Sequence, residues 1–296
     1  MAKITEAFVD QYEAMITHLS QQKKYSFADK SDYRKMTGER TYVDLLDLGN
    51  ATKITGRLQQ TQLQDADHER RAIVAAPYDL TYGIDENDEY TMIADPKGPY
   101  AQNQVAALNR TKDEVFINAA LGSAVTGKTG TSTTALPASQ KVAVDYVNSG
   151  GATNSGLTLA KMIEARRILD ANDVDPDEEK YMVVSAQQIS DLLNNVDKVS
   201  SSDYSQVKAL YNGEINFFMG FKFILTNRFA VDANDYNEVF AFTKNSMVFG
   251  EHYGIKTRID ERPDLNHAIQ VRSTWFGGAV RRDDKGVVSI TCDRSV

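Results

Sequence analysis

Apolar residues recur at helical spacing in four stretches of the chain, and segments of alternating apolar and polar residues separate them. An apolar residue at every third or fourth position lies on one face of a helix. The spacing predicts an amphipathic helix over residues 4–19, a longer helix from Tyr100 to Leu121, and shorter helices over 159–171 and 185–193. Thr158 precedes the third of these helices as a candidate N-cap, because its hydroxyl can accept a hydrogen bond from a free amide of the first turn.

The region between the first two helices follows an extended pattern. Residues 41–46 and 52–58 read as strands on either side of a tight turn, and 71–77 return to extended, buried chain. The intervening run 59–69 has almost no apolar residue and cannot build a core of its own. We therefore expect a long hairpin over residues 41–75, which is poorly stable alone and needs a partner surface.

The second half of the chain alternates helices with short apolar runs. A predicted helix–strand–helix block over 157–194 forms a compact α/β unit. Gly277–Gly278 reads as a hairpin near the C-terminus, and Asp283–Gly286 as the turn before the last strand. The strands expected in this half are 181–185, 217–226, 238–243, 254–260, 268–276 and 287–292.

Composition narrows the class of protein. The 296 residues can form one large domain or two modest ones. A net charge of −8 argues against a protein that grips nucleic acid over a broad basic surface. The single Cys292 excludes an intramolecular disulfide and fits a reducing cytoplasm. Neither an exported nor a membrane-spanning chain is expected, since no run approaches about 18 apolar residues.

One motif suggests an enzyme. Residues 122–129 match the phosphate-loop pattern G-x-x-x-x-G-K-[ST], in which Lys128 and Thr129 would hold phosphate and Mg²⁺. That chemistry requires a strand before the loop and a helix after it. Here a helical pattern precedes the loop, and the β-branched, turn-rich residues 130–137 follow it. A P-loop nucleotide hydrolase using Lys128 and Thr129 is therefore kept only as an unfavoured alternative.

A second candidate site is equally weak. Asp173, Asp175 and Asp177 have the spacing that begins a calcium loop, but Glu178 stands where the bend needs glycine and Val184 where glutamate is needed. A solvated acidic loop is the preferred interpretation. The four histidines are scattered, so we predict no catalytic, cofactor-binding or metal residues, no cofactor and no enzymatic activity.

The order of these parts resembles that of the major capsid proteins of tailed bacteriophages, which share the Hong Kong 97-type fold. The helix Tyr100–Leu121 resembles the family's long spine helix, and residues 122–130 its glycine-rich exit. Residues 181–193 resemble the axial-domain strand and helix, and Met219–Asn227 is similar to a "G-hydrophobic-hydrophobic-S/T-N" strand found there. Residues 277–292 resemble the closing strands.

The resemblance implies an α+β Hong Kong 97-type capsid fold with an N-arm, an extended β-hairpin loop, a peripheral domain with a long spine helix, and an axial domain. The implied divisions are an N-terminal arm at 1–40, the extended loop at 41–75, the peripheral domain at 76–150 with its spine helix at about 100–121, the axial domain at 151–252, and return strands at 253–296.

The function implied is that of a major capsid protein that self-assembles into pentamers and hexamers of an icosahedral shell around double-stranded DNA. The implied partners are other copies of the chain, a separate scaffolding protein, a portal and DNA held by weak non-specific contacts; no membrane is involved. The implied location is the virion capsid, assembled in the cytoplasm of a bacterial host. Lys53 lies where some members cross-link, but no cross-link is predicted. A bacterial nanocompartment shell protein, which is encapsulin-like, is the alternative within the same fold.

Overall fold

The chain folds into two compact units. A computed structural model describes residues 21–46, 49–57, 60, 63–85, 97–147, 151, 153–195 and 217–294. Unit 1 comprises residues 1–25, 77–111 and 253–276, and unit 2 comprises 26–76, 112–252 and 277–296. The helix predicted over residues 4–19 lies outside the described residues.

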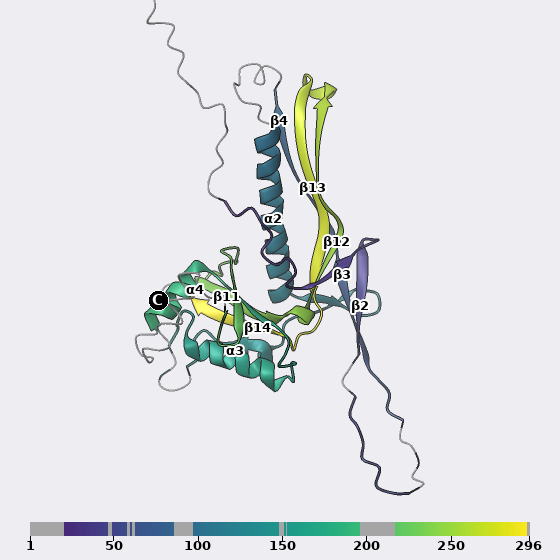
Figure 1. Cartoon of the computed structure of the whole chain (residues 1–296), viewed down its shortest axis with the longest axis vertical. Coiled ribbons are helices and arrows are strands. Elements are labelled where there is room, and N and C mark those ends of the chain that lie inside the picture. Colours follow the sequence, from purple (N-terminus) through teal and green to yellow (C-terminus); the bar gives the residue numbers. More distant parts are fainter. Residues whose placement is uncertain are drawn as a thin grey trace, which may run out of the picture. The chain divides into compact units, whose positions relative to one another are not determined.

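Unit 1 combines one end of a long helix with a sheet. In the sheet, β12 (Met247–Arg262), β13 (Ala268–Arg281) and β4 (Ala76–Ile84) are neighbours in that order. Helix α2 (Lys97–Leu121) runs along these strands in Figure 1. Its buried Gln104 donates to the Val271 carbonyl at 2.7 Å and accepts from Ser273 at 2.8 Å, which ties the helix to β13. A short 3-10 turn, Pro263–Leu265, joins β12 to β13.

Unit 2 is built on a six-stranded mixed sheet that helices flank. Helix α3 (Leu159–Ala171) contributes Met162, Ala165 and Leu169 to an apolar core shared with Met182 and Ile290 of the sheet. Helix α4 (Ala186–Asn195) follows directly after the buried strand β8. The strands, in sheet order, are β7 (Lys141–Val142), β14 (Val287–Asp293), β11 (Tyr236–Thr243), β8 (Lys180–Val184), β10 (Phe221–Leu225) and β9 (Phe217–Phe218).

A second, four-stranded sheet completes unit 2. Its order is β2 (Arg40–Leu46), β3 (His68–Val74), β5 (Ala124–Thr126) and β6 (Ser132–Thr134). Strands β2 and β3 pair antiparallel along their whole length, from Arg40 opposite Val74 to Leu46 opposite His68. The short strand β1 (Asp32–Lys35) pairs in parallel with β12 at Val248–Glu251. Two further 3-10 turns lie at Ala138–Gln140 and Lys244–Ser246.

The predicted helices beyond residue 99 are confirmed, and so is the predicted N-cap of α3. Thr158 Oγ1 accepts from the Lys161 amide at 3.3 Å at the start of α3, as the sequence predicts. Before α4, the Ser185 amide donates to Gln188 Oε1 at 3.0 Å. A side chain from the first turn thus accepts the hydrogen bond of the backbone amide that precedes the helix. No helix within the described residues is long and apolar enough to cross a membrane.

The long hairpin expected over residues 41–75 forms from β2 and β3, but two of the predicted turns are wrong. Residues 52–57 form no strand, and the partner of β2 is β3, which lies beyond the polar run. Gly277–Gly278 lies inside β13, and the turn of the β12–β13 hairpin is at residues 263–267. The reason for a glycine at 278 is close approach, because a Cβ there would lie 2.2 Å from the Val74 carbonyl oxygen.

Candidate functional site

The phosphate-loop match folds as a β-hairpin. Residues 124–126 and 132–134 are the antiparallel strands β5 and β6, and Gly127 (φ 91°) and Gly130 (φ 63°) supply the left-handed turn between them. Helix α2 ends immediately before the motif, and a strand follows where a helix N-terminus would have to hold phosphate. Lys128 and Thr129 therefore lie at the tip of a hairpin, and the P-loop alternative loses its structural basis.

The acidic run after α3 is a turn. Asp175 Oδ1 accepts from the Asp177 amide at 3.0 Å, and Asp173 has a left-handed φ of 57°. Asp173 and Asp175 line a cleft of about 660 Å³ in unit 2 together with Glu178 and Asp44. Across the part of the chain that the structure describes, no group of three His, Cys, Asp or Glu side chains is arranged to hold a metal ion.

A cluster of buried guanidinium groups fixes the exit of α2. Arg281 has no exposed surface, and its Nη1 donates to the carbonyls of Ala120 at 2.8 Å and Gly122 at 2.7 Å. Its Nε donates to Asp284 at 2.5 Å, and Arg71 of β3 donates to the other oxygen of Asp284 at 2.9 Å. Carbonyls at a helix C-terminus carry partial negative charge and are stabilised by cations. The cluster therefore joins the end of α2, the β13–β14 turn and β3.

Sequence reasoning missed this cluster. The only local signal is the pair Arg281–Arg282 beside the acidic turn 283–284, which reads as a solvated charged turn. Nothing in that pattern shows that Arg281 is fully buried while Arg282 bonds Asp32 at 3.2 Å nearer the surface.

A second buried pair lies on the part of α2 that belongs to unit 2. Lys112 donates to Glu251 Oε1 at 2.7 Å, and both side chains are largely buried. The next residue, Asp113, accepts from the amide of Ser26 at 2.9 Å and from its hydroxyl at 3.0 Å. Burial and the neighbouring Glu251 carboxylate raise the pKa of Tyr33, whose hydroxyl lies 3.4 Å from that carboxylate. Lys112 and Asp113, two polar residues within α2, thus help to hold the chain before and within β1.

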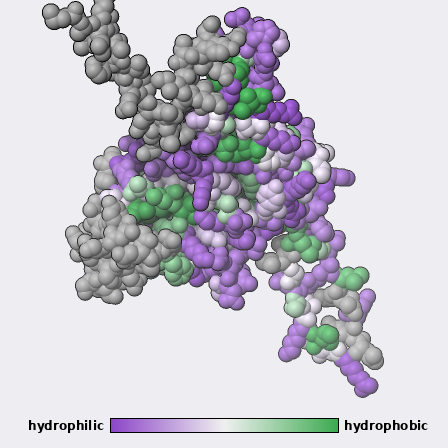
Figure 2. All heavy atoms as spheres, turned by 45° about the horizontal axis from the view of Figure 1, so that its top comes forward, coloured by the Kyte–Doolittle hydropathy of each residue, from purple (hydrophilic) through white to green (hydrophobic). Residues whose placement is uncertain are grey.

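The β2–β3 hairpin is exposed at its open end. Arg70 forms an ion pair with Asp44 at 2.6 Å, and the hydrogen bond that Arg70 donates lowers the pKa of Asp44. The Arg70 guanidinium also lies over the ring of Tyr42. The described residues of the connecting loop, 49–57 and 63–67, extend beyond the ends of the two strands (Figure 1). Ile54 is 81% exposed and Leu63 is 95% exposed. Figure 2 shows a few hydrophobic residues among hydrophilic ones along the hairpin loop.

Comparison with known proteins identifies the family. The model of the family described as phage capsid protein matches residues 4–294. No curated protein matches the chain.

Solved phage capsids share the fold. The capsid of Ralstonia phage GP4 has a TM-score of 0.75 at 11% identity, over 99% of this chain and 97% of that chain. The capsid of cyanophage P-SCSP1u has a TM-score of 0.73 at 16% identity, over 97% and 94% of the two chains. A chain from Mycobacterium phage Che8 has a TM-score of 0.69 at 14% identity, over 96% and 97%. These matches confirm the predicted α+β capsid fold, and the chain belongs to the phage capsid protein family, as a major capsid protein.

Proposed function

We propose that this capsid protein assembles into pentamers and hexamers that tile an icosahedral shell around double-stranded DNA, with no enzymatic activity of its own. The observation that carries the proposal is the β2–β3 loop with its exposed Ile54 and Leu63. Apolar side chains held this far into water become stabilising only when another surface covers them. A shell supplies that surface many times over, because each copy presents the same loop to a neighbour.

The charge of the chain supports the same proposal. A net charge of −8 leaves little affinity for phosphate, so packaged DNA would lie inside without adhering strongly. A separate scaffolding protein and a portal are the further partners we propose, with assembly in the cytoplasm of a bacterial host. The N-arm (1–40), extended loop (41–75), peripheral domain (76–150), axial domain (151–252) and return strands (253–296) are the divisions we propose for the assembled subunit.

The test is to express the full chain alone and with candidate scaffolding proteins, to separate the products on a sizing column, and to image them by negative-stain electron microscopy. We expect closed or partial shells in the void volume. Nuclease treatment of filled particles then distinguishes a DNA container from a shell that encloses proteins. A monomer under every condition, including co-expression with scaffold, would overturn the proposal.

The N-terminal arm is tested in the same assay. Deletion of residues 1–20 should leave a folded protein that assembles poorly, because the apolar stripe predicted there would be lost from intersubunit contacts. Circular dichroism checks folding, and the sizing column checks assembly. Normal shells from the deletion variant would remove the arm from the assembly mechanism.

A further inference from the structure

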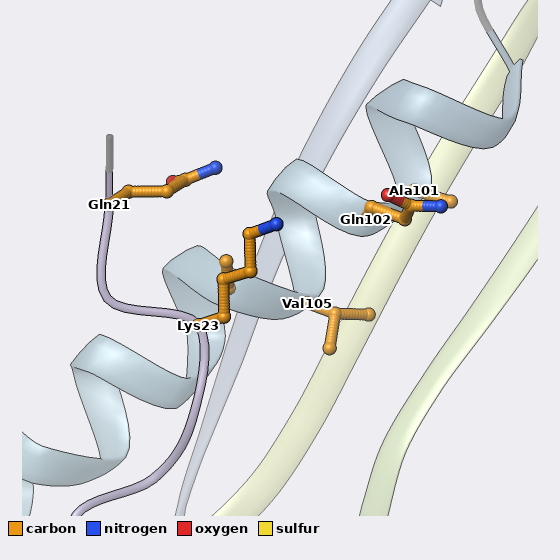
Figure 3. Close-up of a pocket in the computed structure, with 6 residues that line it drawn as sticks. Gln21, Lys23, Ala101, Gln102 and Val105 are labelled. Carbon is orange, nitrogen blue, oxygen red and sulfur yellow. The ribbon is translucent and has the colours of Figure 1, made fainter. Parts of the chain in front are cut away.

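Unit 1 carries an apolar groove on α2. The groove has a volume of about 320 Å³, and its floor is the helix surface of Ala101, Val105 and Ala106. Its other wall is the segment before β1, whose Gln21 and Lys23 side chains point toward the helix in Figure 3. An apolar floor of this kind is stabilised when apolar side chains cover it.

Two hydrogen bonds hold that segment on α2. The Asn109 side chain donates to the Lys23 carbonyl at 2.9 Å, and Arg110 donates to Gln21 Oε1 at 2.6 Å. Residues 1–20 precede the segment, so they join the described chain at Gln21, which itself lines the groove. An occupant from the same molecule thus starts one peptide bond away from the groove.

The end of this N-terminal stretch has the side chains that such a groove takes. Met15, Ile16 and Leu19 are the last members of the apolar stripe predicted over residues 4–19, and Leu19 lies two residues before Gln21. Residues three and four positions apart share one face of a helix, so the three side chains can face α2 together.

The short connection favours the chain's own groove over that of another copy. A short flexible tether holds a binding segment at an effective concentration on the order of millimolar. A second copy, by contrast, has to reach the groove at its solution concentration. The covalent connection therefore favours docking within one chain without any further contact.

We infer that Met15, Ile16 and Leu19 occupy the α2 groove of their own chain before assembly and leave it when the N-terminal arm contacts a neighbouring copy. The docked position goes beyond the proposed function, and the release rests on it. An apolar stripe that is buried in its own groove cannot cover a second surface, so docking opposes contact between copies. Assembly then requires a neighbour that binds the released arm more tightly than the groove does. The groove is thus an autoinhibitory site that raises the concentration needed for assembly.

Intrachain disulfide trapping tests the docked position. Leu19→Cys and Ala101→Cys are combined in the full chain, which is kept dilute and unassembled and is then oxidised. A disulfide requires Cα atoms about 4.4–6.8 Å apart, so only a docked segment closes the loop, which is seen as a faster band on a non-reducing gel. The native Cys292 is buried, which raises its thiol pKa to about 12, and it remains unreactive in the folded chain.

Leu19→Cys with Ala107→Cys is the matched control. Ala107 lies on the same helix and is half-buried like Ala101, but it does not line the groove. We expect the Ala101 pair to form the intrachain disulfide about tenfold more than the Ala107 pair, since burial of a leucine side chain is worth at least that factor. Equal yields for the two pairs, or disulfides between chains only, would overturn the inference and leave the proposed function standing.

Two charge substitutions test the same contact from the N-terminal side. Ile16→Asp places a charge on the predicted apolar stripe, and Thr17→Asp places the same charge on the next residue, off the stripe. Ile16→Asp should lower the yield of the disulfide between positions 19 and 101 about tenfold, because a charge resists burial. Thr17→Asp should change that yield by less than about twofold. Equal losses in the two variants would overturn the docked orientation and the inference with it.

The release is tested by locking the arm in the groove. The chain with Leu19→Cys and Ala101→Cys is oxidised, and its assembly is compared on the sizing column with that of the same chain after reduction. The oxidised chain should need about tenfold more protein to form shells, and reduction should restore assembly. Shells that form equally well in both states would overturn the autoinhibitory role. A wild-type chain that forms no shells under any condition would overturn the proposed function and the release together, while the intrachain disulfide still decides the docked position.

Discussion

The β2–β3 hairpin in unit 2 has an inner end, at the start of β2 and the end of β3, and an outer end, at the connecting loop. The two ends differ in how deeply their side chains are buried. Ile73, near the inner end of β3, is fully buried, whereas Leu63, on the loop that leads into the same strand, is 95% exposed. The inner end also holds Arg71, which bonds Asp284 in the buried cluster. The inner end therefore stabilises the fold of a single chain, whereas the outer end exposes apolar side chains to solvent. Substitutions at the two ends should separate folding from assembly.

The largest effect is expected at Arg281. Arg281→Met keeps the side chain's length but removes the donor to Asp284 Oδ1 and to the carbonyls of Ala120 and Gly122, while Arg71 still donates to Asp284 Oδ2. Removal of one partner from a buried charged network should lower the free energy of unfolding by about 3–5 kcal/mol. Urea denaturation of the unassembled chain measures this change.

Arg70→Met is the matched control, because Arg70 also pairs with an aspartate but lies at the surface. Its partner Asp44 is 57% exposed, so the loss should be about 1 kcal/mol or less. Equal losses for the two arginine variants would contradict the distinction between the buried cluster and the exposed ion pair.

The next largest effect is expected at Ile73. Ile73→Ala removes buried methyl and methylene groups against Gly250 and should lower the free energy of unfolding by about 2–5 kcal/mol. The same urea titration measures it. A loss below about 1 kcal/mol, which is smaller than a cavity of this kind allows, would show that the inner end of the hairpin does not stabilise the single chain.

A smaller effect is expected at Gly278. In Gly278→Ala the new Cβ would lie 2.2 Å from the Val74 carbonyl oxygen, so the two strands must separate. Overpacking of this kind should lower the free energy of unfolding by about 1–3 kcal/mol. Gly254→Ala in β12 is the control, since nothing lies within 4 Å of a Cβ there. If Gly254→Ala destabilised the chain as much, the close approach at Gly278 would not be the cause.

These glycines show where the sequence is informative and where it is not. Helix α3 could be predicted with its cap, because Thr158 and the apolar positions act within a few residues of one another. Gly277–Gly278 carries the same letters as a turn, but its role depends on Val74, far away in the sequence. A local pattern cannot show which distant backbone comes close, so the predicted hairpin was wrong.

The conformation of the phosphate-loop match and the pairing of β2 likewise depend on residues outside the local pattern. Residues 122–129 satisfy a motif, yet the end of α2 before them and the strand pairing of β5 with β6 decide their conformation. Strand β2 pairs with β3 across a polar run that sequence reasoning placed outside the strands. Arg281 could not be predicted at all, because its three carbonyl partners come from Ala120, Gly122 and Thr134.

The smallest effect on folding is expected at Leu63, where the contrast with Ile73 becomes sharpest. Leu63→Ser should change the free energy of unfolding of the unassembled chain by less than about 0.5 kcal/mol, because an exposed side chain has little packing to lose. If Leu63 is buried against a neighbour in the proposed shell, the same substitution should raise the concentration needed for assembly about tenfold or more, because that contact would be lost from every copy. Light scattering over a concentration series measures assembly, and the urea titration measures folding. A Leu63→Ser variant that unfolds more easily but assembles normally would contradict this assignment. The loop would then stabilise its own chain, and another surface would hold the copies together.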